Sequence, residues 1–371
     1  MQQIIHKLRH DTLFIVTTIL VMLASVFGLV SWNSISWPTV LSLSALLGLV
    51  TLFQPLGFID ALADYFIQKA QTTRSLILAI FLLTFFSAMV VTNDVAILTF
   101  LPLTFALAKK ITLPVIKVAV LITIYANLGS SVSPIGNPQN IYLLAHYRLN
   151  FLAMAVPAFL LLLLGLISML LLGRTIPKTP IKPIQKSSTF RSFSSFEKIF
   201  LGLGSIIVLL SLVTQSNLLE SVVLAGLLIF FYDSASFKEI DYGVVLSIIN
   251  FFLLVSVLIR LPAVASWLSD VGRSATHVLI AGVLSSQLIS NVPAAALFAP
   301  ITTHFTALYL AVSVGGFGTL VASLANLLAF RQIKANAEAP LHRNFLFSFT
   351  KYNLLFLFLG IILAWIILLI L

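Results

Sequence analysis

The stretch NLGSSVSPIGNPQNIYL, residues 127–143, places three Asn, one Gln, three Ser, two Gly and two Pro between long apolar runs. Proline interrupts helices, and amide and hydroxyl side chains need hydrogen-bond partners when they are buried. Within a lipid bilayer, irregular backbone is tolerated only where it is buried in protein or lines a watery cavity. If the flanking runs cross a membrane, this stretch predicts a broken helix at a place where polar groups gather.

The composition around this stretch is that of a polytopic membrane protein. Of the 371 residues, 60% are hydrophobic and 9% are charged, with a mean hydropathy of +1.12, whereas soluble domains carry about 25% charged residues. We assign the formal charge of +10 to cytoplasmic loops and expect no nucleic-acid partner. Since the chain has no cysteine, disulfides, thiolate metal sites and a cysteine nucleophile are excluded.

Several apolar segments have the length of a membrane span. They lie near residues 12–31, 38–55, 150–173, 197–214, 217–232, 243–259 and 345–371. The first is too long for the apolar part of a signal peptide, so we expect it to be retained. Two further apolar regions, 75–143 and 276–330, are interrupted by polar clusters.

A basic, proline-containing segment separates two halves of the chain. Residues 174–196 hold five basic residues, three prolines and no acidic residue, and are predicted to form a cytoplasmic linker. The linker joins a first repeat, residues 1–173, to a second repeat, residues 197–371. The sequences of the two halves can therefore be aligned with each other.

The polar clusters recur in the same order in both halves. Setting Asn93 against Asn291 aligns SAMVVTNDVAILTFLPL with SSQLISNVPAAALFAPI, and setting Gly129 against Gly315 aligns Asn140 with Asn326. Each half is predicted to hold a re-entrant hairpin, because its two arms of about 15 residues are too short for two full spans. A broken helix follows each hairpin. The predicted hairpins are 75–108 and 275–310, and the predicted broken helices are 113–147 and 313–330.

The fold class predicted from these elements is an all-α polytopic membrane protein. It is an inverted-repeat transporter fold with about nine full spans. With the N-terminus in the cytoplasm and the C-terminus in the periplasm, the two hairpins enter from opposite faces. Only Arg148, Arg260 and Arg273 of the 21 Lys and Arg then fall on the outer side, as the positive-inside rule requires.

Substrate and ion sites in such folds lie near the bilayer midplane, where half-helix ends converge. Helix N-termini predicted at Asp94 and about Pro138 suit an anion. The carbonyl oxygens of a half-helix ending near Tyr125 and Ala126 suit a cation. The residues predicted to bind substrate are Asn93, Gly129, Ser130, Gly136, Asn137, Gln139, Asn140, Ser290, Asn291, Gly315, Gly316, Ser323 and Asn326.

These residues also have structural interpretations. Asn93 and Asn291 are suited to helix N-caps, and the glycines to close or irregular backbone. Asn137, Gln139 and Asn140 could satisfy the broken backbone alone. Both kinds of role stay open at this point, and capping is compatible with contact to a ligand.

Asp94 and Thr92 are predicted to couple transport to an ion. Asp94 is the one acid placed deep in an apolar region, and such residues are functional by default. Ionised, it would repel an anion and bind Na⁺, and protonated it could carry a proton. His304 is expected about three turns along an arm of the second hairpin as a packing or boundary residue. No metal site and no cofactor are expected beyond Na⁺ as a coupling ion.

The polar motifs carry a family resemblance. TNDVAILTFLPL, SPIGNPQN, SNVP and GGFG followed by ASLAN resemble the ion transporter superfamily of arsenite permeases (ArsB), NhaD-type sodium/proton antiporters, citrate-transporter-like proteins and divalent-anion/sodium symporters. They are most similar to its YbiR-type branch of bacterial inner-membrane anion permeases. The resemblance covers nearly the whole chain. It implies a scaffold domain, a transport domain made of both hairpins and both broken helices, elevator-like movement, and often a dimer.

The chain departs from one branch of this superfamily. In the divalent-anion symporters each hairpin tip reads Ser-Asn-Thr, whereas the tips here read TND at 92–94 and SNV at 290–292. Carboxylate recognition and sodium coupling are therefore not carried over. The Asn-Asp pair is closer to arsenite-permease-like members, for which exchange of an oxyacid with protons would be natural.

The sequence thus predicts a secondary active transporter (permease) that moves a small anion or oxyanion across the bacterial inner membrane. It would be coupled to H⁺ or Na⁺ and work by an elevator-type mechanism. A Na⁺/H⁺ antiporter and an arsenite-type efflux permease are the alternatives. An enzyme is not expected, because the chain has no HExxH motif and its six His are scattered. The expected partners are the lipid bilayer and the anion, and a homodimer is left open.

Overall fold

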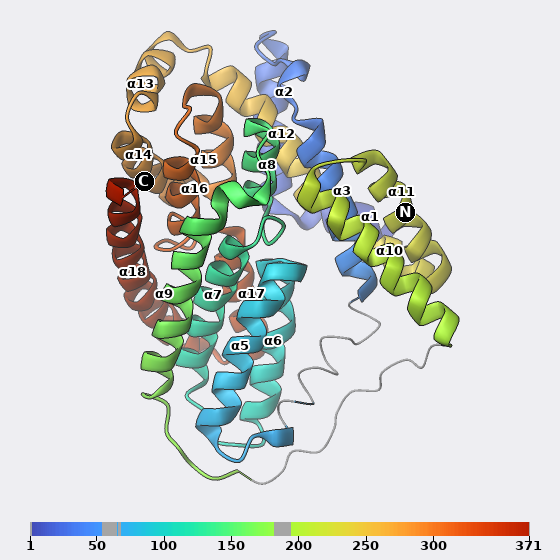
Figure 1. The fold of residues 1–371 in the computed structure, drawn as a ribbon, viewed down its shortest axis with the longest axis vertical. Coiled ribbons are helices and arrows are strands. Elements are labelled where there is room, and N and C mark those ends of the chain that lie inside the picture. Colours follow the sequence, from blue (N-terminus) through green and yellow to red (C-terminus); the bar gives the residue numbers. More distant parts are fainter. Residues whose placement is uncertain (1, 54–64, 66–67, 182–193, 371) are drawn as a thin grey trace.

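The computed structural model describes residues 2–53, 65, 68–181 and 194–370 (Figure 1). Of the predicted linker 174–196, residues 182–193 lie outside the described residues. The prediction of an all-α protein is confirmed. In the part that the structure describes, the chain forms helices without any β-strand, and one isolated bridge pairs Thr72 with Pro180.

The helices of the two halves follow one another in similar order. In the first half they are α1 (Gln2–His10), α2 (Thr12–Val26), α3 (Trp37–Phe53), α5 (Thr73–Val91), α6 (Asn93–Ala108), α7 (Val115–Val132), α8 (Pro138–Tyr147) and α9 (Ala155–Gly173). In the second half they are α10 (Ser195–Thr214), α11 (Leu218–Asp233), α12 (Tyr242–Leu258), α13 (Pro262–Gly272), α14 (Ala275–Ile289), α15 (Asn291–Phe298), α16 (Phe305–Val314), α17 (Leu324–Asn336) and α18 (Ala339–Ile370). Short 3₁₀ helices η1 (Trp32–Ser34), η2 (Phe151–Met154), η3 (Ser234–Lys238) and η4 (Ala299–Ile301) connect some of them.

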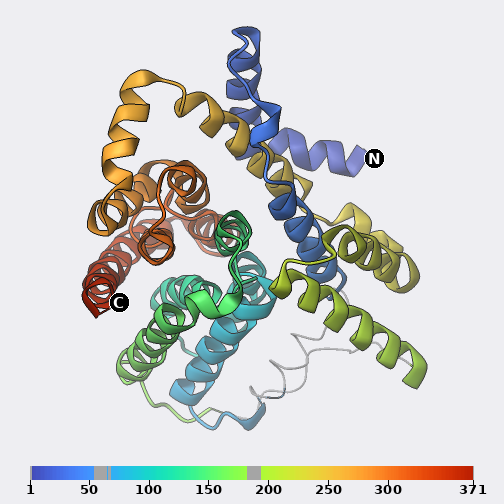
Figure 2. The same cartoon turned by 45° about the horizontal axis from the view of Figure 1, so that its top comes forward.

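The helices gather in two bundles (Figure 1). The hairpin bundle contains α5–α9 and α14–α18, and the flanking bundle contains α1–α3 and α10–α12. Within the first, α7 packs against α5, α6, α9 and α18, and α14 packs against α16. Within the second, α3 packs against α11 and α12 packs against α2. Contacts of α8 with α3 and of α15 with α12 join the bundles. Figure 2 shows α1 at the N-terminus running across the direction of α2.

Helix starts follow local capping signals. The Thr72 hydroxyl accepts a hydrogen bond from the Ser75 N–H at the start of α5, and the Ser75 hydroxyl accepts one from the Thr72 N–H. Asn137 Oδ1 accepts from the Asn140 N–H, and Pro138 takes the first position of α8, where its missing N–H costs nothing. These caps fix where the arms of the hairpin and of the broken helix begin.

The outer surface carries many exposed large apolar side chains, as expected where a protein meets lipid. Helices α2, α9, α10, α11, α14 and α18 all carry such residues, which include Leu170, Phe230, Phe231, Leu288, Phe347 and Leu369. Among the described residues, five helices are long and apolar enough to span a bilayer, or six if the pair α12 and α13, bent by 100°, counts as one span. The number is below the predicted nine or so, because several expected spans form helices of only 10–17 residues.

The first half-helix of the first repeat is longer than predicted. We expected it to end near Tyr125 and Ala126, but α7 continues to Val132. Polar residues within its last turns are satisfied without a break, since the hydroxyls of Ser130 and Ser131 donate to the carbonyl of Asn127. The helix ends at Ser133 because Pro134 follows and forces an extended conformation on the residue before it.

The boundaries in the second repeat also differ from the prediction. The second hairpin ends at Ile301 instead of 310, and the broken helix runs from Phe305 to Asn336 instead of 313–330. Pro300 lies in η4, and Thr302 is extended, so the apolar run does not continue as one helix. His304 is therefore the N-terminal cap residue of α16, not a residue along the hairpin arm.

Candidate functional site

Both hairpins turn through the same unusual backbone. The α5–α6 turn lies at Thr92, with φ 75° and ψ 157°, and the α14–α15 turn lies at Ser290, with φ 76° and ψ 155°. This region is almost restricted to glycine and strains other residues. The two positions are equivalent when Asn93 is aligned with Asn291, so the hairpin tips are built alike. They are also the cap positions, one residue before the asparagines that we considered as caps.

The two helix breaks are closed in the same way by Asn140 of α8 and Asn326 of α17. Each side-chain amide donates hydrogen bonds to backbone carbonyls exposed by its break. The acceptors are Ser130 (3.4 Å), Ser131 (3.2 Å) and Ser133 (2.8 Å) for Asn140, and Gly316 (2.9 Å) and Thr319 (3.1 Å) for Asn326. The alignment of Gly129 with Gly315 sets Ser130 against Gly316 and Ser133 against Thr319. The amides thus bond equivalent carbonyls in both repeats.

The side chain of Asn127 connects the two repeats. It was not predicted from the sequence as a site residue, although Asn127 is the first residue of the stretch 127–143. Its Nδ2 donates to Asn326 Oδ1 (2.9 Å), and its Oδ1 accepts from Asn93 Nδ2 (3.0 Å) and from the Ser323 hydroxyl (3.4 Å). One carboxamide therefore links α6, α7 and α17. A polar residue within an otherwise apolar helix was the available signal.

The glycines of the breaks allow close packing. A Cβ on Gly129 would collide with the carbonyl oxygen of Phe85 on α5, and one on Gly315 would lie 2.6 Å from the Ser286 hydroxyl on α14. A Cβ on Gly136 would collide with the backbone of Ser130. In both repeats, small size at the break lets the hairpin approach the broken helix.

A pocket of about 50 Å³ lies where these elements meet, and we call it the central pocket. The N-termini of α6, α8, α15 and α17 converge on it, and α12 supplies the remaining wall. Its lining residues are Asn93, Asp94, Pro138, Gln139, Val244, Ser247, Ile248, Phe251, Ser290, Asn291, Val292, Pro293, Ser323 and Leu324. Helix N-termini carry partial positive charge and N–H groups that suit an anion.

The predicted substrate residues divide into two groups by position. Five of them line the central pocket, namely Asn93, Gln139, Ser290, Asn291 and Ser323, together with Asp94 of the predicted ion-coupling pair. The others do not line it and instead support the broken backbone around it: Gly129, Ser130, Gly136, Asn137, Asn140, Gly315, Gly316 and Asn326. Substrate contact remains a prediction for both groups, and the geometry favours the first.

Two polar side chains of the central pocket have no hydrogen-bond partner among the described residues. Gln139 is 2% exposed, and its carboxamide makes no hydrogen bond with the described residues. The Asp94 carboxylate likewise has no hydrogen-bond or ion-pair partner there, although the Asp94 N–H donates to Asn93 Oδ1 (3.0 Å). No Lys or Arg lines the pocket among the described residues. An anion in this pocket would depend on helix ends, amides and hydroxyls.

A larger cavity of about 990 Å³, which we call the wide cavity, lies next to the central pocket. Asp94 and Val244 line both spaces, and Thr92 lines the wide cavity. The wide cavity also holds the acidic residues Asp11, Asp233, Glu239 and Asp241 and the basic residues Lys7, Lys238 and Arg331. Asp94 therefore lies between a wide cavity with many charged residues and a small pocket whose other described lining residues are uncharged.

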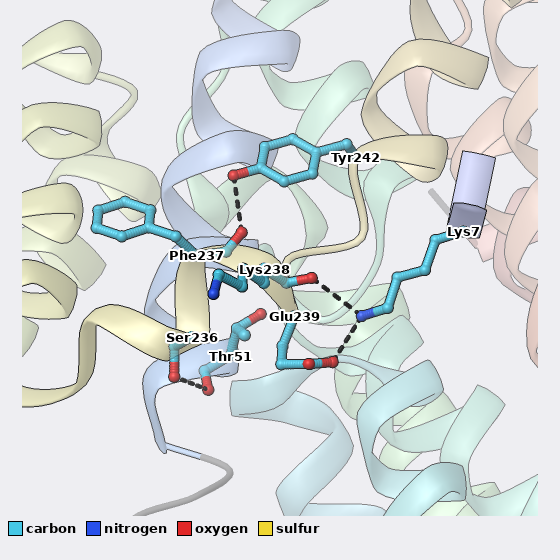
Figure 3. A network of polar contacts seen from close by, with 7 residues as sticks. All are labelled: Lys7, Thr51, Ser236, Phe237, Lys238, Glu239 and Tyr242. Carbon is cyan, nitrogen blue, oxygen red and sulfur yellow. Dashed lines mark hydrogen bonds and ion pairs between the residues drawn. The ribbon is translucent and has the colours of Figure 1, made fainter. Parts of the chain in front are cut away.

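A network of polar contacts ties α1 and α3 to the segment before α12 at the wall of the wide cavity (Figure 3). Lys7 Nζ contacts Glu239 Oε2 at 2.6 Å and the Lys238 carbonyl at 3.1 Å, and the Tyr242 hydroxyl donates to the Phe237 carbonyl at 3.0 Å. These contacts hold the N-terminal helix against the cavity. Among the described residues, no three acidic or histidine side chains are grouped as metal ligands.

The sequence is similar to a known transporter family and to known membrane proteins. The sequence matches the family described as citrate transporter (CitMHS) over residues 4–307. It is 28% identical over 333 residues to the uncharacterized transporter MJ0456 of Methanocaldococcus jannaschii. The aligned region covers 88% of this chain and 90% of that protein. It is 30% identical over 307 residues to the inner membrane protein YbiR of Escherichia coli, with 81% of each chain covered.

A solved structure has the same fold. The YdaH transporter of Alcanivorax borkumensis superposes with a TM-score of 0.54 at 16% identity, over 87% of this chain and 84% of that one. The similarity supports the arrangement of helices described above. The resemblance predicted from the polar motifs is confirmed at the level of the family.

Proposed function

The chain is a membrane transporter that belongs to the citrate transporter (CitMHS) family, and we propose that it is a secondary active transporter of a small anion or oxyanion. We propose further that H⁺ or Na⁺ drives the transport and that the protein works in the bacterial inner membrane. The N-terminus would lie in the cytoplasm and the C-terminus in the periplasm. The relative YbiR is described as an inner membrane protein, which supports this location.

The central pocket is the observation that carries the proposal. Four helix N-termini, two from each repeat, converge on one small space, and this is the arrangement that holds an anion without cationic side chains. The carboxamide of Gln139 is buried there without a hydrogen-bond partner in the described part of the chain. An anion would supply the acceptors that these donors lack.

Asp94 gives a physical reason for coupling. An ionised carboxylate on the wall of the pocket repels an anion, and no Lys or Arg of the lining offsets that charge. Binding of H⁺ or Na⁺ at Asp94 removes the repulsion, so the anion and the cation favour each other's binding. Because Asp94 also lines the wide cavity, the cation can reach it without crossing the central pocket.

The two bundles support an elevator-type movement. Both hairpins and both broken helices lie in the hairpin bundle, whereas the flanking bundle meets it through α3 and α12. A rigid displacement of the hairpin bundle would carry the four helix N-termini together. In this proposal the hairpin bundle, which also holds α9 and α18, would act as the transport domain and the flanking bundle as the scaffold.

A Na⁺/H⁺ antiporter is the second candidate, and one observation favours it. The carboxylate of Asp94 faces a wide cavity that holds four further acidic side chains against three basic ones, and this excess of negative charge attracts cations. In that case Asp94 would bind Na⁺ and H⁺ in turn, and no anion would be needed. The central pocket would then have no assigned cargo.

Flux in proteoliposomes distinguishes the candidates. We expect uptake of a small anion down an imposed pH or Na⁺ gradient by the wild-type protein. Asp94→Asn should retain anion exchange but lose its dependence on the gradient, whereas Asp270→Asn, on exposed α13, should behave as wild type. A Na⁺-driven pH change of equal size with and without anions would reject the anion transporter in favour of the antiporter.

A further inference from the structure

One face of α12 forms a wall of the central pocket. Val244, Ser247, Ile248 and Phe251 line it, with the spacing of consecutive turns on a single helix face. Three of these side chains are apolar. Ser247 is the only one that offers a hydrogen-bonding group from this wall.

The hydroxyl of Ser247 is buried and has no partner. The residue is 1% exposed, and its Oγ makes no hydrogen bond with the described part of the chain. Several other helical serines donate to a carbonyl one turn earlier, as Ser286 does to Gly282 and Ser256 does to Leu253. Burying a hydroxyl without a partner is costly, so each case requires a reason.

The pocket that this hydroxyl lines is small and carries no cationic side chain among its described lining residues. A water molecule needs about 10–15 Å³ of such space, so about 50 Å³ admits roughly four groups of that size. Citrate, with three carboxylates on a branched carbon chain, exceeds that room. It would also place three negative charges beside Asp94 without a cationic partner.

We propose that Ser247 donates a hydrogen bond to the transported anion, and that this anion is compact and singly charged, such as formate or nitrate, rather than a tricarboxylate. The inference rests on the proposed function and adds the chemical class of the cargo. The cargo then touches both bundles, because Ser247 belongs to the flanking bundle and the helix N-termini belong to the hairpin bundle. Movement of the hairpin bundle would break the contact with Ser247 and keep the others.

Ser42 on α3 provides a matched control. Its hydroxyl is also buried without a partner among the residues that the structure describes, but the residue lines neither the central pocket nor the wide cavity. Ser247→Ala and Ser42→Ala both remove an unsatisfied hydroxyl from a helix, and alanine favours helix. Both variants should therefore fold, and both should melt about 2 °C or more above the wild type when no anion is present.

The test measures binding by calorimetry and uptake in proteoliposomes for formate, nitrate and citrate. We expect formate or nitrate to bind the wild type more tightly than citrate does. Ser247→Ala should weaken that binding about tenfold or more, the worth of a hydrogen bond to a charged group. Ser42→Ala should bind as the wild type does.

The test distinguishes failure of this inference from failure of the proposed function. Equal affinity of Ser247→Ala and the wild type, or tighter binding of citrate than of both compact anions, overturns this inference and leaves an anion transporter. If the wild type binds and carries none of the three anions but exchanges Na⁺ for H⁺, the proposed function fails and this inference fails with it.

Discussion

Asn127 donates a hydrogen bond to Asn326 Oδ1 at 2.9 Å, although the two residues are 199 positions apart and belong to different repeats. The same Asn127 side chain accepts a hydrogen bond from Asn93 at the first hairpin tip. All three amides are buried. The arrangement of the two repeats around the central pocket therefore depends on one chain of side-chain hydrogen bonds.

We predict that Asn127 and Asn326 are energetically coupled. Asn127→Ala leaves the Asn93 amide and the Asn326 carbonyl oxygen buried without this partner, which should cost about 1–3 kcal/mol. Combining it with Asn326→Ala should cost less than the sum of the single changes, because the second change removes a group that the first left unpaired. Thermal unfolding of the purified variants measures all three.

Asn336→Ala is the control for this cycle. Asn336 lies on the same helix as Asn326 but is exposed, and its amide bonds only Gln332 one turn earlier. Asn336→Ala alone should hardly change the free energy of unfolding. Its effect should simply add to that of Asn127→Ala. Additive losses for Asn127 and Asn326 would contradict the coupling.

Gly129 should not tolerate alanine. An added Cβ would collide with the carbonyl oxygen of Phe85, so α5 and α7 would have to separate at the hairpin. We predict a loss of about 3 kcal/mol or more, since backbone cannot move aside as a side chain can. Gly226→Ala on α11 is the control: its Cβ would meet nothing within 4 Å and should stabilise its helix by about 0.5–1 kcal/mol. Similar melting temperatures for both variants would refute the close contact.

The repeat and its polar centre could be predicted because their polar residue types differ from the apolar sequence around them. Asn, Ser and Gly clusters within apolar runs require buried partners, so matching clusters predict matching breaks. The structure agrees in detail: Thr92 and Ser290 share nearly equal backbone angles, and Asn140 and Asn326 bond aligned carbonyls. The sequence pattern carries this information because both features are local to the aligned motifs.

The partners of these motifs could not be read from the pattern. Asn127 lies inside a continuous helix, and its importance depends on Asn93 and Asn326, which only the packing brings to it. The wall formed by α12 is similar, since one serine in an apolar helix has no distinctive spacing. The end of the second hairpin was missed for another reason: Pro300 follows an apolar run without polar residues, and we read the run as one arm.

Thr92→Gly should stabilise the protein. Its φ of 75° and ψ of 157° lie in a region nearly exclusive to glycine, at a cost of about 1–3 kcal/mol for other residues. Glycine also loses more conformational entropy on folding than other residues do, which lowers the gain in stability by about 0.5–1 kcal/mol. Thr92 lines the wide cavity but is only 4% exposed, so losing its side chain also removes some packing, and a net gain of at most about 1 kcal/mol is expected.

Thr104→Gly tests whether the backbone of Thr92 is responsible. Thr104 is buried within α6, with its hydroxyl bonded to the Phe100 carbonyl. Glycine there should destabilise by about 2 kcal/mol, through lost helix propensity and lost burial. Unfolding in detergent would show opposite shifts for the two variants, and a loss of stability in Thr92→Gly would exclude strain at the tip.

Tyr309→Phe should weaken the contact between the two broken helices. The buried Tyr309 hydroxyl on α16 donates to the Ser131 carbonyl near the end of α7 at 2.6 Å, and phenylalanine keeps the ring but removes the donor. Ser131 retains the bond from Asn140, so we expect a loss of about 1 kcal/mol. Tyr142→Phe is the matched control, because the Tyr142 hydroxyl has no hydrogen-bond partner among the described residues and its removal should not lower the melting temperature. If both tyrosine variants unfold at the wild-type temperature, this cross-repeat bond does not stabilise the site.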